Sequence, residues 1–227
     1  MNCVDNYINI KNSLPDYVRI LAVSKTKPES LILQLYEAGH RDFGENKVQE
    51  LLSKYNNLPK DIRWHLIGHL QTNKVKYIVP FVYMIQSVDS KKLLEEINKR
   101  AIAAGVVVKV LLQPKIAEEE TKTGFSIPDL DQLFRDSDFI NSLSGVKICG
   151  LMAVATDTDD QEILLNEFGS IKTLFDKIKN NYFASDNDFK IISEGMSGDY
   201  PIAVKAGSNM VRIGSTIFGT RDYSKVE

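Results

Sequence analysis

Short apolar or β-branched runs alternate with longer amphipathic stretches along this chain of 227 residues. A short continuous apolar run predicts a buried strand, whereas apolar residues spaced three to four apart predict a helix that buries one face. The pattern predicts eight strands: Arg19 to Ser24, Arg41 to Gly44, Arg63 to Gly68, Tyr83 to Val88, Val106 to Gln113, Lys147 to Val154, Lys190 to Ser193 and Met210 to Ile213.

Helical patterns separate these strands. They cover Pro28 to Ala38, Lys47 to Tyr55, Asn73 to Val79, Ser90 to Ala104, Pro128 to Arg135, Gln161 to Asn181 and Pro201 to Ala206. Pro28, Pro128 and Pro201 stand near helix starts, where a missing amide hydrogen costs little, and Gly105 stands just past a helix end. A segment from Val4 to Lys11 predicts an additional helix that packs over one end.

Alternating strands and helices predict a parallel sheet, and eight strands in this length match a compact (β/α)₈ TIM barrel. We therefore expect a single α/β barrel domain over residues 1–227 with an extra N-terminal helix. A doubly wound open sheet is the alternative. No Gly-x-Gly-x-x-Gly follows the first strand and no phosphate-binding loop of the Walker type is present, which favours the barrel.

Composition narrows the classes of function. The chain is 43% hydrophobic and 26% charged, as in globular proteins, and its net charge of −2 provides no global basic field for nucleic acid or anionic membrane. Apolar runs such as Ile148 to Ala155 fall far short of the ~20 residues of a membrane span. Asp5 interrupts any signal-peptide pattern, so we expect a cytoplasmic protein in which Cys3 and Cys149 are reduced thiols.

Two lysines follow the first strand, at the end of a barrel where function is located. Lys25 directly continues the apolar strand, whereas Lys27 abuts Pro28 and should lie farther out. Burial and a neighbouring ammonium both lower the pKa of an amine, which leaves more free base to attack a carbonyl. Lys25 is therefore a candidate Schiff-base lysine, and a solvated surface lysine is the alternative.

The loops after the last two strands predict a phosphate site. Residues 193–199 combine two glycines, the hydroxyl of Ser197 and a following short helix, and Gly214 with Ser215 adds two further donors after the eighth strand. A phosphate site built from these two loops recurs in barrels. Two ordinary glycine-containing turns are the alternative.

Other polar residues should lie at the same rim. They are Gly44 to Asn46 after the second strand, Gly68 to Lys74 after the third, and Arg212 at the end of the eighth. His65 and His69 are four residues apart but straddle a strand end, which argues against a zinc pair and favours a packed or rim histidine. The acidic run Glu118 to Glu120 is interpreted as a solvated loop.

Five motifs together resemble the pyridoxal phosphate homeostasis protein family, in the family's order and over nearly the whole chain. They are Val23-Ser24-Lys25-Thr26-Lys27-Pro28, Phe43-Gly44-Glu45-Asn46, Trp64-His65-Leu66-Ile67-Gly68 with Leu70-Gln71-Thr72-Asn73-Lys74, Gly195-Met196-Ser197, and Val211-Arg212-Ile213-Gly214 with Phe218-Gly219-Thr220-Arg221-Asp222-Tyr223. The resemblance implies a (β/α)₈ barrel similar to the first domain of bacterial alanine racemase, with pyridoxal 5'-phosphate as cofactor.

The same resemblance implies roles for individual residues. Lys25 corresponds to the lysine that forms the internal aldimine, Ser197, Gly214 and Ser215 to phosphate-binding positions, Arg212 to the partner of the pyridine nitrogen, Asn46 to a polar residue beside the cofactor, and Lys122 to a lysine near the site. One segment departs from the family: Gln113-Pro114-Lys115 stands where many relatives have an apolar residue and Asn.

The resemblance and the single barrel predict a non-catalytic carrier that buffers or delivers the cofactor, with apo enzymes as recipients, and we expect a monomer. Because the guanidinium of Arg212 cannot accept a hydrogen bond from a pyridinium, the ring nitrogen should stay unprotonated and the ring should be a weak electron sink. Because one barrel uses the 227 residues, we also expect no counterpart of the racemase's second domain, which supplies a tyrosine acid/base. The alternatives are an amino-acid racemase or lyase that uses Tyr223 or Lys27 as acid/base, and a sugar-phosphate barrel enzyme without the cofactor.

Overall fold

Eight parallel strands form a closed barrel in the computed structural model, which describes residues 2–116 and 123–220. Each strand pairs with its sequence neighbour, and the last strand pairs with the first. The strands are β1 (Arg19–Val23), β2 (Asp42–Glu45), β3 (Arg63–Leu66), β4 (Met84–Val88), β5 (Val108–Leu112), β6 (Val146–Met152), β7 (Ile191–Ser193) and β8 (Met210–Ile213). All eight predicted strands and the predicted barrel are confirmed.

Closure of the barrel makes the two ends of the sequence neighbours in space. Leu21 of β1 lies opposite Arg212 of β8, and Ala22 lies opposite Ile213. The carboxyl ends of β1 and β8 are therefore adjacent, which brings the loop of Lys25 beside the loops that follow the last strands.

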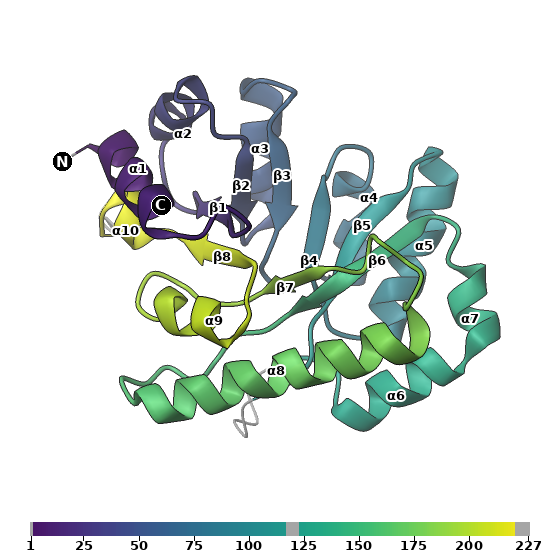
Figure 1. The fold of residues 1–227 in the computed structure, drawn as a ribbon. Coiled ribbons are helices and arrows are strands. Elements are labelled where there is room, and N and C mark those ends of the chain that lie inside the picture. Colours follow the sequence, from purple (N-terminus) through teal and green to yellow (C-terminus); the bar gives the residue numbers. More distant parts are fainter. Residues whose placement is uncertain (1, 117–122, 221–227) are drawn as a thin grey trace.

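The helices surround the barrel, as Figure 1 shows. Their bounds are α1 (Cys3–Ser13), α2 (Glu29–Glu37), α3 (Val48–Asn57), α4 (Val75–Ile78), α5 (Lys91–Ala104), α6 (Ile127–Arg135), α7 (Ser137–Ser142), α8 (Gln161–Tyr182), α9 (Tyr200–Ala206) and α10 (Ser215–Phe218), with a 3₁₀ turn, η1, at Thr72–Lys74. Every predicted helix is present. The hydrophobic pattern did not predict α7 and α10, because both helices are too short to show a periodic pattern.

Local chemistry explains where the helices begin and end. The Ser90 hydroxyl accepts a hydrogen bond from the Leu93 amide at the start of α5, and Gly105 ends that helix with a φ of 66°, a conformation that favours glycine. The Asp160 carboxylate accepts bonds from the first amides of α8. Pro28, which precedes α2, and the prolines in the first turns of α6 and α9 stand where the sequence placed them.

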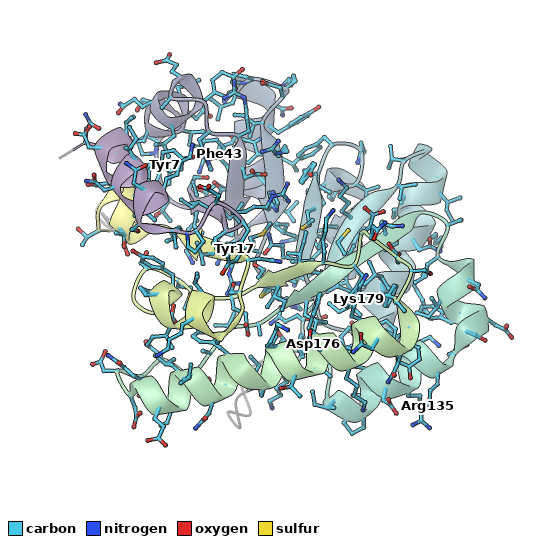
Figure 2. The ribbon with its side chains drawn as sticks, in the orientation of Figure 1. Tyr7, Tyr17, Phe43, Arg135, Asp176 and Lys179 are labelled. Carbon is cyan, nitrogen blue, oxygen red and sulfur yellow. The ribbon has the colours of Figure 1, made fainter. Side chains whose placement is uncertain are left out.

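The predicted N-terminal helix, α1, packs between α2 and α10; Figure 1 shows α1 and α10 side by side. The Tyr7 hydroxyl lies 3.2 Å from Nδ1 of His40, and the His40 ring meets the edge of Phe43 in β2. Figure 2 shows Tyr7 and Phe43 on this same side of the molecule. Aromatic contacts therefore attach α1 to the barrel.

Alternation along the strands divides the core into two layers. One layer lies between the sheet and the helices and includes Trp64, Ile85, Ile192 and Val211. Their sequence neighbours point into the barrel, because successive side chains face opposite sides of a strand. An apolar cluster fills part of that interior: Met84, Leu111, Cys149, Met152, Ile191 and Met210.

Two further features of the structure concern its cysteines and the length of its helices. Cys3 and Cys149 are both buried and unbonded to each other. No helix within residues 2–116 and 123–220 combines the length and apolar character that a membrane crossing requires.

Candidate functional site

A cavity of about 340 Å³ opens at the carboxyl ends of the strands. Five of the six residues proposed from sequence line it together: Lys25, Ser197, Arg212, Gly214 and Ser215. The other lining residues are Val23, Lys27, Ile67, Met196, Gly198 and Gly219. The volume falls in the range of small-molecule sites.

Asn46, the sixth predicted residue, directly follows β2 but is not among the residues that line the cavity. Its backbone packs against Gly68, where an added Cβ would lie only 2.4 Å from the Asn46 carbonyl oxygen. Glycine at position 68 is therefore required by this close approach. The role of Asn46 beside a cofactor stays a prediction, and Lys122 and Tyr223 lie outside the described residues.

The atypical segment after β5 is engaged with its own neighbours. The Phe125 amide donates to the Gln113 carbonyl and the Lys115 amide donates to the Phe125 carbonyl, both at 2.8 Å. The Gln113 side chain donates to the Thr123 carbonyl at 3.0 Å. Gln113 therefore supports this loop and is not among the cavity-lining residues.

The loop that carries Lys25 has an unusual backbone. Thr26 has a φ of 63° and is the one non-glycine residue with positive φ among the described ranges. This conformation costs of order 1 to 3 kcal/mol for a β-branched residue, so the surroundings must impose it. The Thr26 amide donates a 2.6 Å hydrogen bond to the Glu50 carboxylate of α3, which holds the turn.

A buried ion cluster lies behind this turn. The ammonium of Lys54 donates to Glu45 and Glu50 at 2.8 and 2.7 Å and to the Ser24 carbonyl at 2.8 Å. Glu45 is fully buried, which raises its pKa to about 7, although Lys54 opposes the shift. The Ser24 hydroxyl donates to Glu45 at 2.6 Å, and the second oxygen of Glu45 has no hydrogen-bond partner within the described part of the chain. The cluster thus anchors both residues that flank Lys25.

Sequence reasoning missed this cluster. Lys54 lies on the buried face of α3, together with Val48 and Leu51. A lysine on the apolar side of a helix, four residues after a glutamate, was the available signal.

Two lysines, Lys25 and Lys27, line the cavity. Both are partly buried. The Lys27 ammonium donates to three carbonyls at the end of α10, those of Phe218, Gly219 and Thr220, at 3.3, 2.9 and 2.8 Å. All three donors of the Lys27 ammonium are therefore engaged by backbone carbonyls, which direct this side chain to the end of α10.

The loops after β7 and β8 meet at Ser197. Its hydroxyl oxygen accepts long hydrogen bonds from the amides of Gly214 and Thr216, at 3.3 and 3.4 Å. Gly195 has a φ of 87° and an added Cβ there would lie 2.8 Å from Cα of Tyr200, so the first loop turns tightly into α9. Two amides and a hydroxyl therefore converge where the sequence predicted an oxyanion site.

Arg212 forms a buried cationic wall of the cavity. Its guanidinium donates to the carbonyls of Ser193 and Ala153, at 2.6 and 2.8 Å. Burial lowers the pKa of Arg212 to about 10, so it stays charged at neutral pH. Glu194 is fully buried, neither of its carboxyl oxygens has a hydrogen-bond partner among residues 2–116 and 123–220, and burial raises its pKa to about 9. Glu194 is thus neutral at pH 7, and Asp199 is the other acidic group whose charge acts on Arg212.

The two histidines near the third strand do not come together. His65 is fully buried inside the barrel and contacts Asp42 and Gln86. His69 is exposed and lies 3.1 Å from Asp89. The interpretation as packed and rim histidines is confirmed.

Comparison with known proteins first defines a class. Residues 2–222 match the family described as alanine racemase, N-terminal domain. An alanine racemase of Clostridium difficile shares the fold at a TM-score of 0.80 with 18% identity, and this chain covers 58% of that protein. The structure of PipY from Synechococcus elongatus with PLP bound is 32% identical, at a TM-score of 0.86, over 96% of this chain and 100% of that one.

Sequence identity to individual relatives then identifies a particular family. The pyridoxal phosphate homeostasis protein of Aquifex aeolicus is 38% identical over 206 residues, which are 90% of this chain and 88% of the relative. The Escherichia coli protein of the same name is 34% identical over 215 residues, 93% and 89% of the two chains. This chain belongs to the pyridoxal phosphate homeostasis protein family, as the sequence motifs predicted.

Proposed function

We propose that this protein binds pyridoxal 5'-phosphate in the cavity at the carboxyl ends of the strands and serves vitamin B6 homeostasis. The observation that carries the proposal is that Lys25, Ser197 and Arg212, which come from opposite ends of the sequence, line one cavity. The bound state of PipY and the names of the relatives support the same ligand.

The residues present fit this cofactor. The amides of Gly214 and Thr216 already converge on the Ser197 hydroxyl, as donors for a phosphate oxygen would. Arg212 supplies a fixed buried charge that favours an anionic ligand. When bound, the cofactor supplies an aldehyde and an electron-withdrawing ring. Lys25 would be the residue that holds the cofactor covalently, because its amine is the nucleophile at the cavity that the aldehyde would require.

The surroundings support storage and delivery rather than turnover. Among the described residues that line the cavity there is no Asp, Glu, His or Tyr that could shuttle a proton. The Lys27 side chain donates its hydrogen bonds to three backbone carbonyls at the end of α10. Arg212, being charged, disfavours a protonated ring nitrogen and so weakens the ring as an electron sink. We therefore propose a monomeric cytoplasmic carrier with apo enzymes as recipients; a racemase or lyase that uses Tyr223 is the alternative.

Covalent attachment is tested by trapping. Pyridoxal 5'-phosphate is added to purified protein, borohydride reduces the adduct, and peptide mapping locates it. We expect the label on Lys25, its loss in Lys25→Ala, and normal labelling in the control Lys47→Ala, which replaces an exposed lysine on a neighbouring loop. A label mainly on another lysine of the unmodified protein would contradict the assignment.

The phosphate subsite is tested by comparing pyridoxal 5'-phosphate with pyridoxal. Charge-assisted hydrogen bonds contribute about 1.5 to 3 kcal/mol each, so loss of several should weaken binding by about two orders of magnitude or more. Ser197→Ala should have a smaller effect because the amides remain. Equal affinity for the two compounds would remove the phosphate assignment.

The absence of turnover is tested by deuterium exchange at the α-carbon of a panel of amino acids. We expect little exchange. Saturable exchange at enzymic rates that disappears in both Lys25→Ala and Tyr223→Phe would establish the enzyme alternative and overturn the carrier function.

A further inference from the structure

A chain of side-chain hydrogen bonds runs through the barrel interior from the cavity wall. Arg212 Nη1 donates to Ser193 Oγ at 3.1 Å, and Ser193 Oγ donates to Gln86 Oε1 at 2.8 Å. Gln86 Nε2 then lies 2.9 Å from Nδ1 of His65. These four residues come from β8, β7, β4 and β3, and each is at most 4% exposed. The chain thus lies beside the apolar cluster, because Gln86 Nε2 is 3.2 Å from the sulfur of Met210.

The chain continues to the opposite end of the barrel. His65 Nε2 lies 3.2 Å from Asp42 Oδ1, and Arg63 donates to both oxygens of Asp42, at 2.8 and 2.6 Å. Asp42 and Arg63 are the first residues of β2 and β3, and the Arg63 side chain is 41% exposed. A solvent-accessible ion pair at the amino ends of the strands is therefore linked to the cavity at their carboxyl ends.

The chemistry of the groups gives every bond in the chain one direction. The amide nitrogen of Gln86 can only donate, so Nδ1 of His65 accepts and its proton resides on Nε2, where it is donated to Asp42. Oε1 of Gln86 can only accept, so the Ser193 hydroxyl donates to it and turns a lone pair toward Arg212. Reversal of one bond disturbs its neighbours, because each polar group is buried and needs its partner.

His65 is kept neutral by its surroundings. The charged and titratable groups around it are Asp42, Arg19, Arg63, His40 and the ring of Tyr83 at 5.3 Å. Burial lowers the pKa of His65 and outweighs the opposing hydrogen bond to Asp42. The neutral imidazole with its proton on Nε2 is the form that the direction of the chain requires.

We propose that Ser193, Gln86 and His65 are positioning residues that fix the guanidinium of Arg212 at the cavity, and that this chain couples the cavity to the Asp42–Arg63 ion pair. Gln86 and His65 are not among the residues that line the cavity, so they act on a ligand only through the chain. The inference rests on the proposed function only in taking pyridoxal 5'-phosphate as the ligand.

Two substitutions of Gln86 separate positioning from stability. Gln86→Leu removes the bonds to Ser193 and His65, together with the contact to the Met210 sulfur, and leaves Ser193 without its acceptor. Gln86→Glu keeps an acceptor for the Ser193 hydroxyl. Its second carboxylate oxygen replaces the amide nitrogen beside Nδ1 of His65, so that the imidazole lies between two carboxylates and must carry a proton on each nitrogen. Met84→Ala is the matched control, because Met84 is buried in the same strand and faces the same interior without belonging to the chain.

The first measurement uses the protein without added cofactor. Nitrogen NMR should report neutral His65 with its proton on Nε2 in the parent protein and an imidazolium in Gln86→Glu at pH 7. Loss of a hydrogen bond is worth about a factor of ten in an equilibrium constant, so the guanidinium protons of Arg212 should exchange about tenfold faster in Gln86→Leu. Parental exchange rates are expected in Gln86→Glu and Met84→Ala. Equal rates in Gln86→Leu and Met84→Ala would overturn the proposal.

The second measurement titrates pyridoxal 5'-phosphate by its visible absorbance across pH. Gln86→Leu should bind about tenfold more weakly and shift the pH at which the absorbance changes, whereas Gln86→Glu should recover the affinity. Parental binding with an unshifted profile in Gln86→Leu would overturn the coupling. Failure of the parent protein itself to bind would overturn the proposed function alone, because the exchange measurement still decides the chain.

Discussion

The two walls of the cavity are held by different kinds of interaction. The wall that carries Lys25 rests on ions, with Lys54 between Glu45 and Glu50 and all three packed against the outside of the sheet. The wall that carries Arg212 rests on neutral groups inside the barrel, Ser193 and Gln86. Ions attract strongly in a buried site but each costs several kcal/mol to desolvate, whereas neutral groups interact more weakly and in one direction only.

The difference suits what each wall has to hold. The Lys25 wall must impose a strained turn at Thr26, and strain of this size needs strong anchoring. The Arg212 wall must hold a cation without neutralising it, so neutral acceptors serve better than a carboxylate. The nearby carboxyl of Glu194 fits this requirement because it is neutral at pH 7.

Removal of the central cation should have the largest effect of the changes considered. Lys54→Met leaves Glu45 buried without a counter-charge, and breaking a buried pair in this way costs about 3 to 5 kcal/mol. The free energy of unfolding, measured with denaturant, should fall by that amount. Lys177→Met, at an exposed position on α8, is the control.

A second substitution sharpens this prediction. Glu45→Gln in the Lys54→Met background removes the uncompensated carboxyl and should recover part of the lost stability. The double variant should still trap less cofactor at Lys25 because the support of the Ser24 carbonyl is gone. A loss below about 1 kcal/mol in Lys54→Met would show that the cluster does not hold this wall.

On the wall that carries Arg212, replacement of the buried carboxyl of Glu194 should raise the free energy of unfolding instead of lowering it. Its pKa rises from 4.5 to about 9 on folding. The folded protein therefore keeps a proton that the unfolded chain releases, and stability is lost as pH rises from about 4.5 to 9. Glu194→Met should stabilise the cofactor-free protein by about 3 kcal/mol at pH 7 and by about 1 kcal/mol at pH 5.

Denaturant unfolding at the two pH values measures this difference. Glu95→Met, at an exposed position of α5, controls for the added apolar side chain and should show no pH-dependent gain. A Glu194→Met variant less stable than the parent at pH 7 would mean that the carboxyl is ionised and bonded in solution.

The sequence predicted the architecture and most of the cavity, and the reason is the regularity of barrels. Strand ends are visible in the hydrophobic pattern, and closure brings them together, so Lys25 and Arg212 could be assigned to one site without knowledge of any contact. The motifs added Ser197, Gly214 and Ser215, which also line the cavity.

The supports of the cavity could not be predicted in the same way. Glu45 belongs to a quoted motif, but its partner Lys54 becomes visible only when α3 is docked on β2. The chain through Gln86 and Ser193 joins residues 107 positions apart, and no local pattern carries such a pairing. The hydrophobic pattern of the sequence identifies the face of a helix or strand on which a residue lies, whereas the packing of these elements determines which residue it contacts.

The smallest expected effect concerns the turn itself. Thr26→Gly relieves the cost of a β-branched residue at a φ of 63° but adds freedom to the unfolded chain, so the two effects, each about 1 kcal/mol, should nearly cancel. The looser turn should nevertheless weaken cofactor binding by about threefold, because Lys25 must be ordered on binding. Thr26→Asn is the matched variant, since Asn tolerates positive φ without the flexibility of glycine, and it should keep the parental affinity. Absorbance titrations and denaturant unfolding of both variants decide the point: equal weakening in the two would show that the Thr26 side chain, rather than the rigidity of the turn, supports binding.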